Sequence, residues 1–254
     1  MQHDLSTPEL VRHLRKVGLR PSQRTIDAIL ERGDEAAAPL LELALDTEAL
    51  LGPEPGSLGP LHALRLLGEL RPVAAAEPLL RHLPLPVDDR PGQGAFLWAQ
   101  EAPQIVANFG ADVLPVVLAI TDDLTTSALQ RGAAFATLGF LATTTPELRE
   151  QIIDELRTRF ARETEPTARG YLVATLAQLK ARAAYDEIMA AFRDKTVDRS
   201  VMSAADARQL LLGTQTQRQL DCALHSLAER YEQHGPYSEE QQQAMAEMAQ
   251  SRGY

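Results

Sequence analysis

The chain contains one cysteine, Cys222, and one tryptophan among its 254 residues. A single cysteine cannot form an intramolecular disulfide, and the apolar neighbours of Cys222 predict a buried, unreactive thiol. Aromatic residues make up only 5% of the chain, so Ala and Leu must form most of the core, which favours close packing of helices. No apolar run reaches the ~20 residues that a membrane-spanning helix needs.

Basic side chains are also in deficit, because 25 Lys and Arg residues stand against 35 Asp and Glu residues, for a formal net charge of -10. This charge repels phosphate backbones, so we do not expect nucleic acid to be a partner. The first residues lack the basic stretch and apolar core of a secretory signal. Together these features predict a cytoplasmic protein of a bacterium-like cell, with no membrane association.

Recognisable catalytic and metal-binding motifs are missing as well. The six histidines are scattered, and no two of them have the spacing of a metal site. The sequence has no nucleophile elbow, phosphate-binding loop or dinucleotide fingerprint. The acid pairs Asp88-Asp89 and Asp122-Asp123 are interpreted as solvated loop carboxylates. We therefore predict no cofactor, no metal and no catalytic residue.

What the sequence does contain is an internal repeat. A proline followed by an apolar segment recurs at Pro39, Pro78 and Pro115, at intervals of 39 and 37 residues. The apolar pattern continues without proline at residues 151–156 and 187–192. Residues 131–141 recur as residues 169–179 with six of eleven positions identical. Self-similarity at this interval is typical of stacked helical repeats, in which each unit buries its apolar face against its neighbours.

Helical periodicity and capping signals divide each repeat into two helices. Because proline is tolerated in a first turn, each repeated proline is expected to lie in the first turn of a second helix. Asp34 is expected to cap the first of these, directly after a left-handed Gly33. The expected helices cover residues 6–18, 21–33 and its partner with Pro39, 58–70 and 73–83, 96–109 and 112–120, 126–141 and 146–160, 167–179 and 183–192, 203–212, 216–231, and a last segment from residue 238.

Residues 84–94 form the longest interruption of the repeat. Repeat proteins place binding determinants in such excursions, so Asp88, Asp89, Arg90 and Trp98 form a candidate rim site. The alternative interpretation is a solvated turn that tolerates insertion, with Trp98 packed beneath it.

Arg131 and Arg169 occupy the same position of consecutive repeats. They could form a basic ladder for an acidic ligand. We favour a structural role, in which each arginine bridges the loop between helices to a nearby acid. The available acids are Asp122, Asp123, Glu163 and Glu165.

The repeated motifs resemble HEAT-like repeats, including the subclass named for phycobilisome lyases. Residues 20–212 are also similar to an uncharacterised bacterial family of HEAT-like proteins. Some of its members carry a cysteine-rich SEC-C tail, which this chain lacks. The resemblance implies a helical-repeat fold and a bacterial setting, and it implies no activity.

We therefore predict an all-α protein, a right-handed α-solenoid of about five HEAT-like helical hairpins with terminal capping helices. Residues 1–212 are expected to form the solenoid. Residues 213–254 are expected to form C-terminal capping helices, with a final segment that docks weakly or is mobile.

The predicted function is non-catalytic binding of a protein or peptide along a concave face formed by the second helices. The candidate contact residues there are polar positions between core positions, namely Glu42, Arg81, His82, Asp154, Arg157 and Arg193. Three alternatives stay open: a lyase-type enzyme or enzyme accessory, a DNA-glycosylase-type fold, and a purely structural oligomer.

Overall fold

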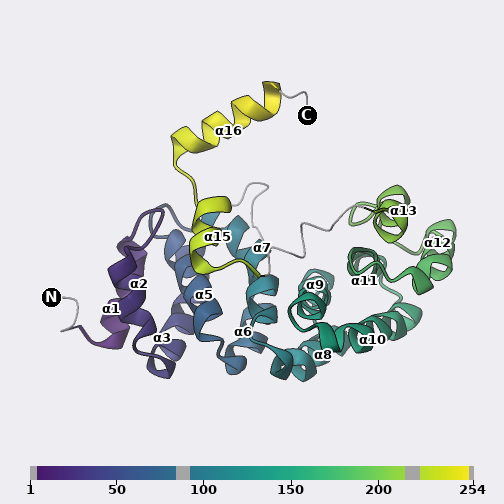
Figure 1. Cartoon of the computed structure of the whole chain (residues 1–254), viewed down its shortest axis with the longest axis horizontal. Helices are drawn as coiled ribbons and strands as arrows, with labels where there is room; N and C mark the ends of the chain where they lie inside the picture. Colours follow the sequence, from purple (N-terminus) through teal and green to yellow (C-terminus); the bar gives the residue numbers. More distant parts are fainter. Residues whose placement is uncertain (1–4, 84–91, 215–223, 252–254) are drawn as a thin grey trace. The chain divides into compact units, whose positions relative to one another are not determined.

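The computed structural model describes residues 5–83, 92–214 and 224–251 (Figure 1). Every regular element in these residues is a helix, and none is a strand, which confirms the all-α prediction. The chain forms two compact units. The first contains residues 1–70, 84–100 and 225–254, and the second contains residues 71–83 and 101–224.

The first unit is built around one apolar helix, α5 (Leu58–Leu70), whose first ten residues are all buried. The close approach of its neighbours is visible at Gly59, where a Cβ atom would lie 3.1 Å from the Cα atom of Arg15. The helices α3, α4 and α2 and the short helix η2 all pack against α5. The elements of this unit are α1 (Thr7–His13), η2 (Leu14–Lys16), α2 (Gln23–Leu30), α3 (Asp34–Ala44), α4 (Thr47–Leu50), α5, the first half of α7 (Gln93–Ala107), α15 (Leu227–Gln233) and α16 (Glu239–Ser251).

In the second unit, helices that follow one another along the chain pack against one another. The helix α9 contacts α8, α10 and α11, and α11 in turn contacts α10 and α13. The elements are η3 (Val73–Ala75), α6 (Ala76–Arg81), the second half of α7, η4 (Ala111–Val113), α8 (Leu114–Asp122), α9 (Ala128–Thr144), η5 (Pro146–Leu148), α10 (Arg149–Arg162), α11 (Pro166–Gln178), η6 (Arg182–Ala184), α12 (Tyr185–Arg193) and α13 (Ala204–Leu212).

The repeat seen in the sequence is a repeat of helix starts. When a preceding 3-10 turn is counted as part of the helix, the second helices start at Asp34, Val73, Ala111, Pro146 and Arg182. The intervals between these starts are 39, 38, 35 and 36 residues. Four of these five helices open with a single 3-10 turn, the elements η3 to η6. The five expected helical pairs are therefore present.

Two details of the expected helix starts are wrong. Pro78 and Pro115 lie in the first α-helical turn of α6 and α8, each after a 3-10 turn, whereas Pro39 is the sixth residue of α3, which has no 3-10 turn before it. Gly33, with a positive φ of 53°, occupies the cap position of α3, so Asp34 is its first residue and not its cap. The carboxylate of Asp34 still lies at the positively polarised end of the helix dipole.

The expected single helix over residues 216–231 is also wrong in its described part. The chain is not helical at His225 and Ser226, and α15 begins at Leu227. A new helix starts here because the Ser226 hydroxyl accepts a bond from the Glu229 amide and the Glu229 carboxylate accepts from the Ser226 amide.

Arginines connect successive helical pairs of the second unit. Arg131 on α9 forms an ion pair with Glu163, and both side chains are buried. The guanidinium of Arg169 donates a 2.7 Å bond to the Glu163 carbonyl and lies 4.6 Å above the Phe160 ring. The structural role expected for the two arginines is confirmed for Arg131, which bonds an acid of the loop, whereas Arg169 reaches the same loop through a main-chain carbonyl and not through an acid.

The glycines that follow these arginines permit the close packing of neighbouring repeats. A Cβ atom at Gly132 would lie 2.5 Å from the ring of Tyr171, and one at Gly170 would lie 2.8 Å from the Cβ atom of Val201. Each glycine thus lets a side chain of the following pair approach the helix backbone.

We expect Arg131→Met to lower the free energy of unfolding by about 3–5 kcal/mol, because the substitution leaves the Glu163 carboxylate buried without its counter-charge. The double variant Arg131→Met/Glu163→Gln should regain part of this loss, since no charge is then buried. Urea denaturation at neutral pH measures both values. The exposed Arg162 provides a control, and Arg162→Met should change stability by at most about 1 kcal/mol. A loss below about 1 kcal/mol for Arg131→Met would contradict this account.

Candidate functional site

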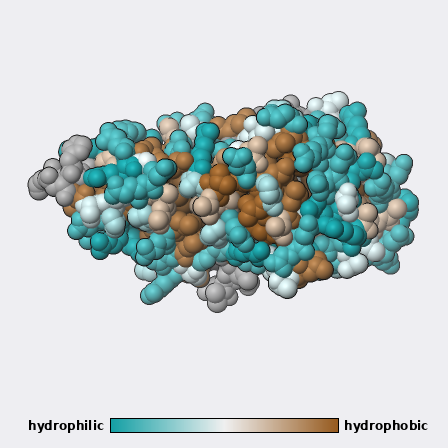
Figure 2. All heavy atoms as spheres, turned by 90° about the horizontal axis from the view of Figure 1, so that it is seen from below, coloured by the Kyte–Doolittle hydropathy of each residue, from teal (hydrophilic) through white to brown (hydrophobic). Residues whose placement is uncertain are grey.

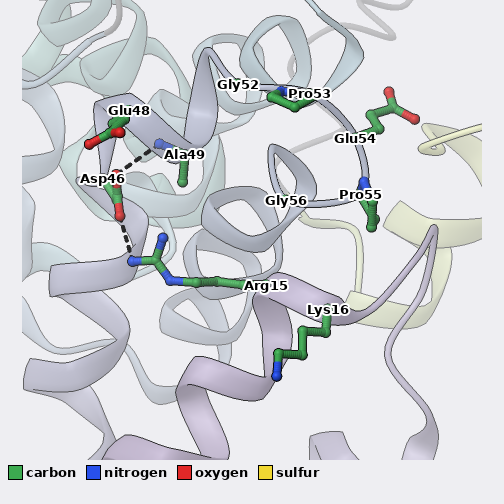
Figure 3. Close-up of a pocket in the computed structure, with 10 residues that line it drawn as sticks. All are labelled: Arg15, Lys16, Asp46, Glu48, Ala49, Gly52, Pro53, Glu54, Pro55 and Gly56. Atoms are coloured by element: carbon green, nitrogen blue, oxygen red, sulfur yellow. Dashed lines mark hydrogen bonds and ion pairs between the residues drawn. The ribbon is translucent and has the colours of Figure 1, made fainter.

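A hollow of about 660 Å³ lies in the first unit, between η2, α4 and the loop that follows α4 (Figure 3). Its lining residues are Arg15, Lys16, Asp46, Glu48, Ala49 and the loop residues 52–56. Arg15 reaches across it to form an ion pair with Asp46. Burial acts to raise the pKa of Asp46, but bonds from the Ala49 amide and from Arg15 outweigh it and hold the pKa below its usual value. Asp46 is thus a helix cap and an ion-pair partner, and its proton is not available for acid catalysis.

A smaller hollow of about 210 Å³ lies in the second unit, at the end of α8 and α10. Asp122 there forms ion pairs with both Arg159 and Arg162, and Arg159 also bonds Glu155 and the Thr121 hydroxyl. These charges pair with one another across neighbouring helices. In the part of the chain that the structure describes, no three His, Cys, Asp or Glu side chains are placed to hold a metal ion.

The six predicted contact residues lie on second helices or directly after them, and they fall into two groups. Arg81 bonds Glu77, Asp123 and Thr126, and Arg157 forms a 2.8 Å ion pair with Glu187 on α12. The hydrogen bond that Arg81 donates to Asp123 raises the pKa of Arg81. Bonds from Thr125 and Arg81 lower the pKa of Asp123. These two arginines thus connect one second helix to the following part of the repeat.

The other four residues differ from this pair in their surroundings. His82 is half-buried at the end of α6. The side chains of Glu42, Asp154 and Arg193 are exposed, and none of the three forms a hydrogen bond or an ion pair within the described residues. Glu42 belongs to the first unit, and the other five residues belong to the second.

The candidate rim site is only partly described. Asp88, Asp89 and Arg90 lie outside the described residues. Trp98, on α7, has no exposed surface, which favours the interpretation that it packs in the core. Hydrophobic side chains do reach the surface elsewhere, as Figure 2 shows by brown patches between hydrophilic residues. On α8 four residues outside the core are apolar, namely Pro115, Val116, Leu118 and Ala119, and the last residue, Asp122, is exposed and charged.

The most specific arrangement of polar groups lies in the first unit, where a C-terminal segment crosses α5 and the start of α7. We call this segment, residues 226–238, the strap. It consists of the capping residue Ser226, the helix α15 and the five non-helical residues 234–238. The strap site is the set of side chains that bond it, His62, Arg65 and Glu69 on α5 and Gln93 on α7.

Three backbone positions of the strap are bound by side chains of the site. The Arg65 guanidinium donates a 2.7 Å bond to the carbonyl of Gly235. The Gln93 side-chain amide bonds Tyr237 twice, because its oxygen accepts from the Tyr237 amide at 2.5 Å and its nitrogen donates to the Tyr237 carbonyl at 3.1 Å. Glu69 accepts a bond from the Leu227 amide at 3.2 Å. The site therefore recognises main-chain groups, as a neighbouring strand would.

One side chain of the strap, Tyr231, is bound in a more specific way. Its hydroxyl lies 2.8 Å from Nδ1 of His62, and the Arg65 guanidinium lies 4.5 Å above the centre of its ring. Tyr231 is 7% exposed, while His62 and Arg65 are 0% and 1% exposed. A cation over an aromatic ring away from water contributes about 2 kcal/mol, so Tyr231 is the main anchor of the strap.

The hydrogen bonds fix which nitrogen of His62 carries the proton. Nε2 lies 2.9 Å from the carbonyl of Gly18, which can only accept, so Nε2 donates there and Nδ1 accepts from the Tyr231 hydroxyl. Burial lowers the pKa of His62 to about 4, and the nearby positive charge of Arg65 acts in the same direction. His62 is therefore neutral at pH 7, and its protonation opposes strap binding.

Two further histidines meet at the ends of α15. Nδ1 of His225 lies 2.8 Å from Nε2 of His234, so one imidazole donates a hydrogen bond to the other. The bond joins His225, which precedes the Ser226 cap, to His234, which caps the other end of the helix. It stabilises the short helix α15, which has only seven residues and would be marginal alone.

The sequence of α5 contains a signal for the strap site, a polar stripe on an apolar helix. In the apolar helix α5, the only charged or imidazole side chains are His62, Arg65 and Glu69. Their spacing of three and four residues places them on one face. A polar stripe on an otherwise apolar helix indicates a polar partner, although it does not identify that partner.

Comparison of the chain with family models, with curated proteins and with solved structures found no match. No single helix among the described residues combines the length and apolar composition of a membrane span, although α7 and the following helix pass a composition test as a bent pair.

We expect the pH dependence of stability to report His62. Its pKa is about 4 in the folded chain and 6.5 in the unfolded chain, so on acidification the unfolded state binds the proton first. Stability should therefore fall between pH 6.5 and pH 4, by up to about 3 kcal/mol from this group. His62→Gln should lose this component and show a shallower decline. Urea denaturation of both proteins from pH 7.5 to pH 4.5 measures the difference, and parallel curves would contradict the assignment.

Proposed function

We propose that this chain is a non-catalytic binding protein of the HEAT-like repeat type, and that it holds a segment of a protein partner, a short helix followed by non-helical chain, at the strap site. The proposal is supported mainly by the paired bonds of Gln93 to the main chain of Tyr237. Main-chain recognition of this kind gives affinity for an extended segment whatever its side chains, and neighbouring pockets or anchors add the specificity.

The regular spacing of helix starts supports the helical-repeat part of the proposal. Each repeat presents equivalent helices to its neighbours, so a stack of them forms an extended surface with repeated binding positions. We propose the right-handed solenoid arrangement on this ground. The exposed residues Glu42, Asp154 and Arg193 of the second helices stay predicted contacts for a partner.

The net charge of -10 bears on the class of partner. It disfavours a nucleic acid and favours a segment that carries few acidic residues. The strap itself brings Arg230, which is 3% exposed, into this acidic protein. A protein segment with basic and aromatic residues matches the surface best.

The proposal predicts binding of a strap peptide in trans. The probe is a fluorescein-labelled peptide with the sequence of residues 226–238, SLAERYEQHGPYS. The protein is the full chain with Tyr231→Ala, which weakens the attachment of its own strap. We expect saturable binding in a fluorescence anisotropy titration, because the main-chain partners of Arg65 and Gln93 are then supplied by the peptide.

The same titration contains its controls. Adding Gln93→Leu should weaken binding by at least about tenfold, since two hydrogen bonds to the peptide main chain are lost. The matched change Gln151→Leu, at an exposed position of α10, should leave the affinity unchanged. The absence of saturable binding to a variant whose circular dichroism shows native helix content would contradict the proposed function.

A further inference from the structure

The strap occupies its site as a bound peptide would. The parts of the strap in direct contact with the site are buried, namely Arg230, Tyr231, Gly235 and Pro236. Other positions of the strap, such as Ala228, Glu229, Glu232 and Gln233, are exposed. A segment that belonged to the core would bury a continuous apolar stripe. The strap is instead held at a few anchor points.

The anchor points lie far from the strap in sequence. His62 and Tyr231 are separated by 169 positions, and Arg65 and Gly235 by 170. The bonds that join them are polar, so each has an equivalent in water when the strap leaves. Polar, long-range attachment of a short segment is easier to reverse than the packing of α3 on α5.

Glycine at position 235 is required by the geometry of the strap. Its φ is +84°, and a Cβ atom there would lie 2.8 Å from the ring of Tyr237. The bond from Arg65 to the Gly235 carbonyl depends on this conformation. At position 237, two residues after Gly235, the Gln93 oxygen accepts from a main-chain N–H group. Any residue except proline can supply this group.

We propose that the strap is an intramolecular ligand that competes for its own binding site, and that the fitting partner is a protein segment with the pattern Tyr-x-x-x-Gly followed by extended chain. This inference rests on the proposed function. The tyrosine supplies the hydroxyl for His62 and the ring for Arg65. The glycine supplies the carbonyl for Arg65, and the main chain two residues later pairs with Gln93.

Competition has a measurable consequence. A tethered segment is present at a high effective concentration, commonly in the millimolar range, so a partner binds only to the fraction of molecules whose strap is released. The apparent affinity of a partner segment is lowered by that fraction. Weakening the strap should therefore increase the affinity for a peptide without any change in the site itself.

The charges around His62 provide a second way to release the strap. The groups that face its ring are Arg65 on α5 and Tyr231 on α15, and Arg20 lies 5.4 Å from the centre of the same tyrosine ring. Two carboxylates of this unit are bound to other groups, Glu69 to the Leu227 amide and Glu232 to Arg20. A proton on His62 therefore faces positive charge and breaks the acceptor role of Nδ1.

The test compares three full-length proteins, the wild type, Tyr231→Ala and Gly235→Ala, in titrations with the labelled strap peptide. We expect both variants to bind the peptide at least about tenfold more tightly than the wild type does. A peptide in which the tyrosine equivalent to Tyr231 is replaced by alanine should bind both variants at least about tenfold more weakly. Two different variants are used so that a folding defect in one does not decide the result.

The outcomes separate the two proposals. Equal affinity of the three proteins for the peptide would overturn the intramolecular competition and leave the proposed function intact. No binding by any of the three folded proteins would overturn both. Tight binding that ignores the tyrosine of the peptide would overturn the sequence pattern proposed for the partner.

Discussion

Arginine side chains of the second unit bind groups that lie beyond their own helix, farther along the chain. Arg131 on α9 is buried because Glu163, beyond α10, neutralises it. Arg149 and Arg182, at the starts of the next second helices, donate to main-chain carbonyls at Leu179 and Leu211. These carbonyls lie at helix ends and have no partner within their own helix. Each repeat therefore leaves polar groups that only its neighbour can satisfy, which keeps successive pairs in register.

The same requirement explains the strap. Helix α5 buries His62 and Arg65 within an apolar surface, and such groups are costly to bury without hydrogen bonds. Nε2 of His62 donates to the Gly18 carbonyl, and the C-terminal segment supplies further partners through the Tyr231 hydroxyl and the Gly235 carbonyl. A surface that needs main-chain carbonyl and hydroxyl groups is by its chemistry a surface for peptides, and this connects the stability of the fold to the proposed function.

The electrostatics of the two candidate surfaces differ for a physical reason. On the second helices, the arginines at positions 81 and 157 have acids within reach, so their charges are compensated inside the fold. At the strap site Arg65 has a carbonyl and an aromatic ring as partners, and the neutral His62 beside it adds no charge. A cation that binds a carbonyl and a ring of a displaceable segment can exchange that segment for another that supplies the same groups, whereas the cation of a surface ion pair gains little from a new partner.

The sequence by itself determined the helical class and the spacing of the pairs, because proline, glycine and apolar periodicity act locally on the backbone. It also pointed to the structural role of Arg131, since an acid stood at a suitable distance along the repeat. It placed Pro39 wrongly and predicted helix at His225 and Ser226, where there is none, because neighbouring turns compete within a few residues of each helix boundary. The polar stripe of α5 was readable as well. Its partner was not, because the bond between His62 and Tyr231 joins positions 169 residues apart, and no local pattern encodes such a distance. Only the tertiary structure could decide which segment completes that stripe, since pairing over this range follows from how the whole chain folds back on itself.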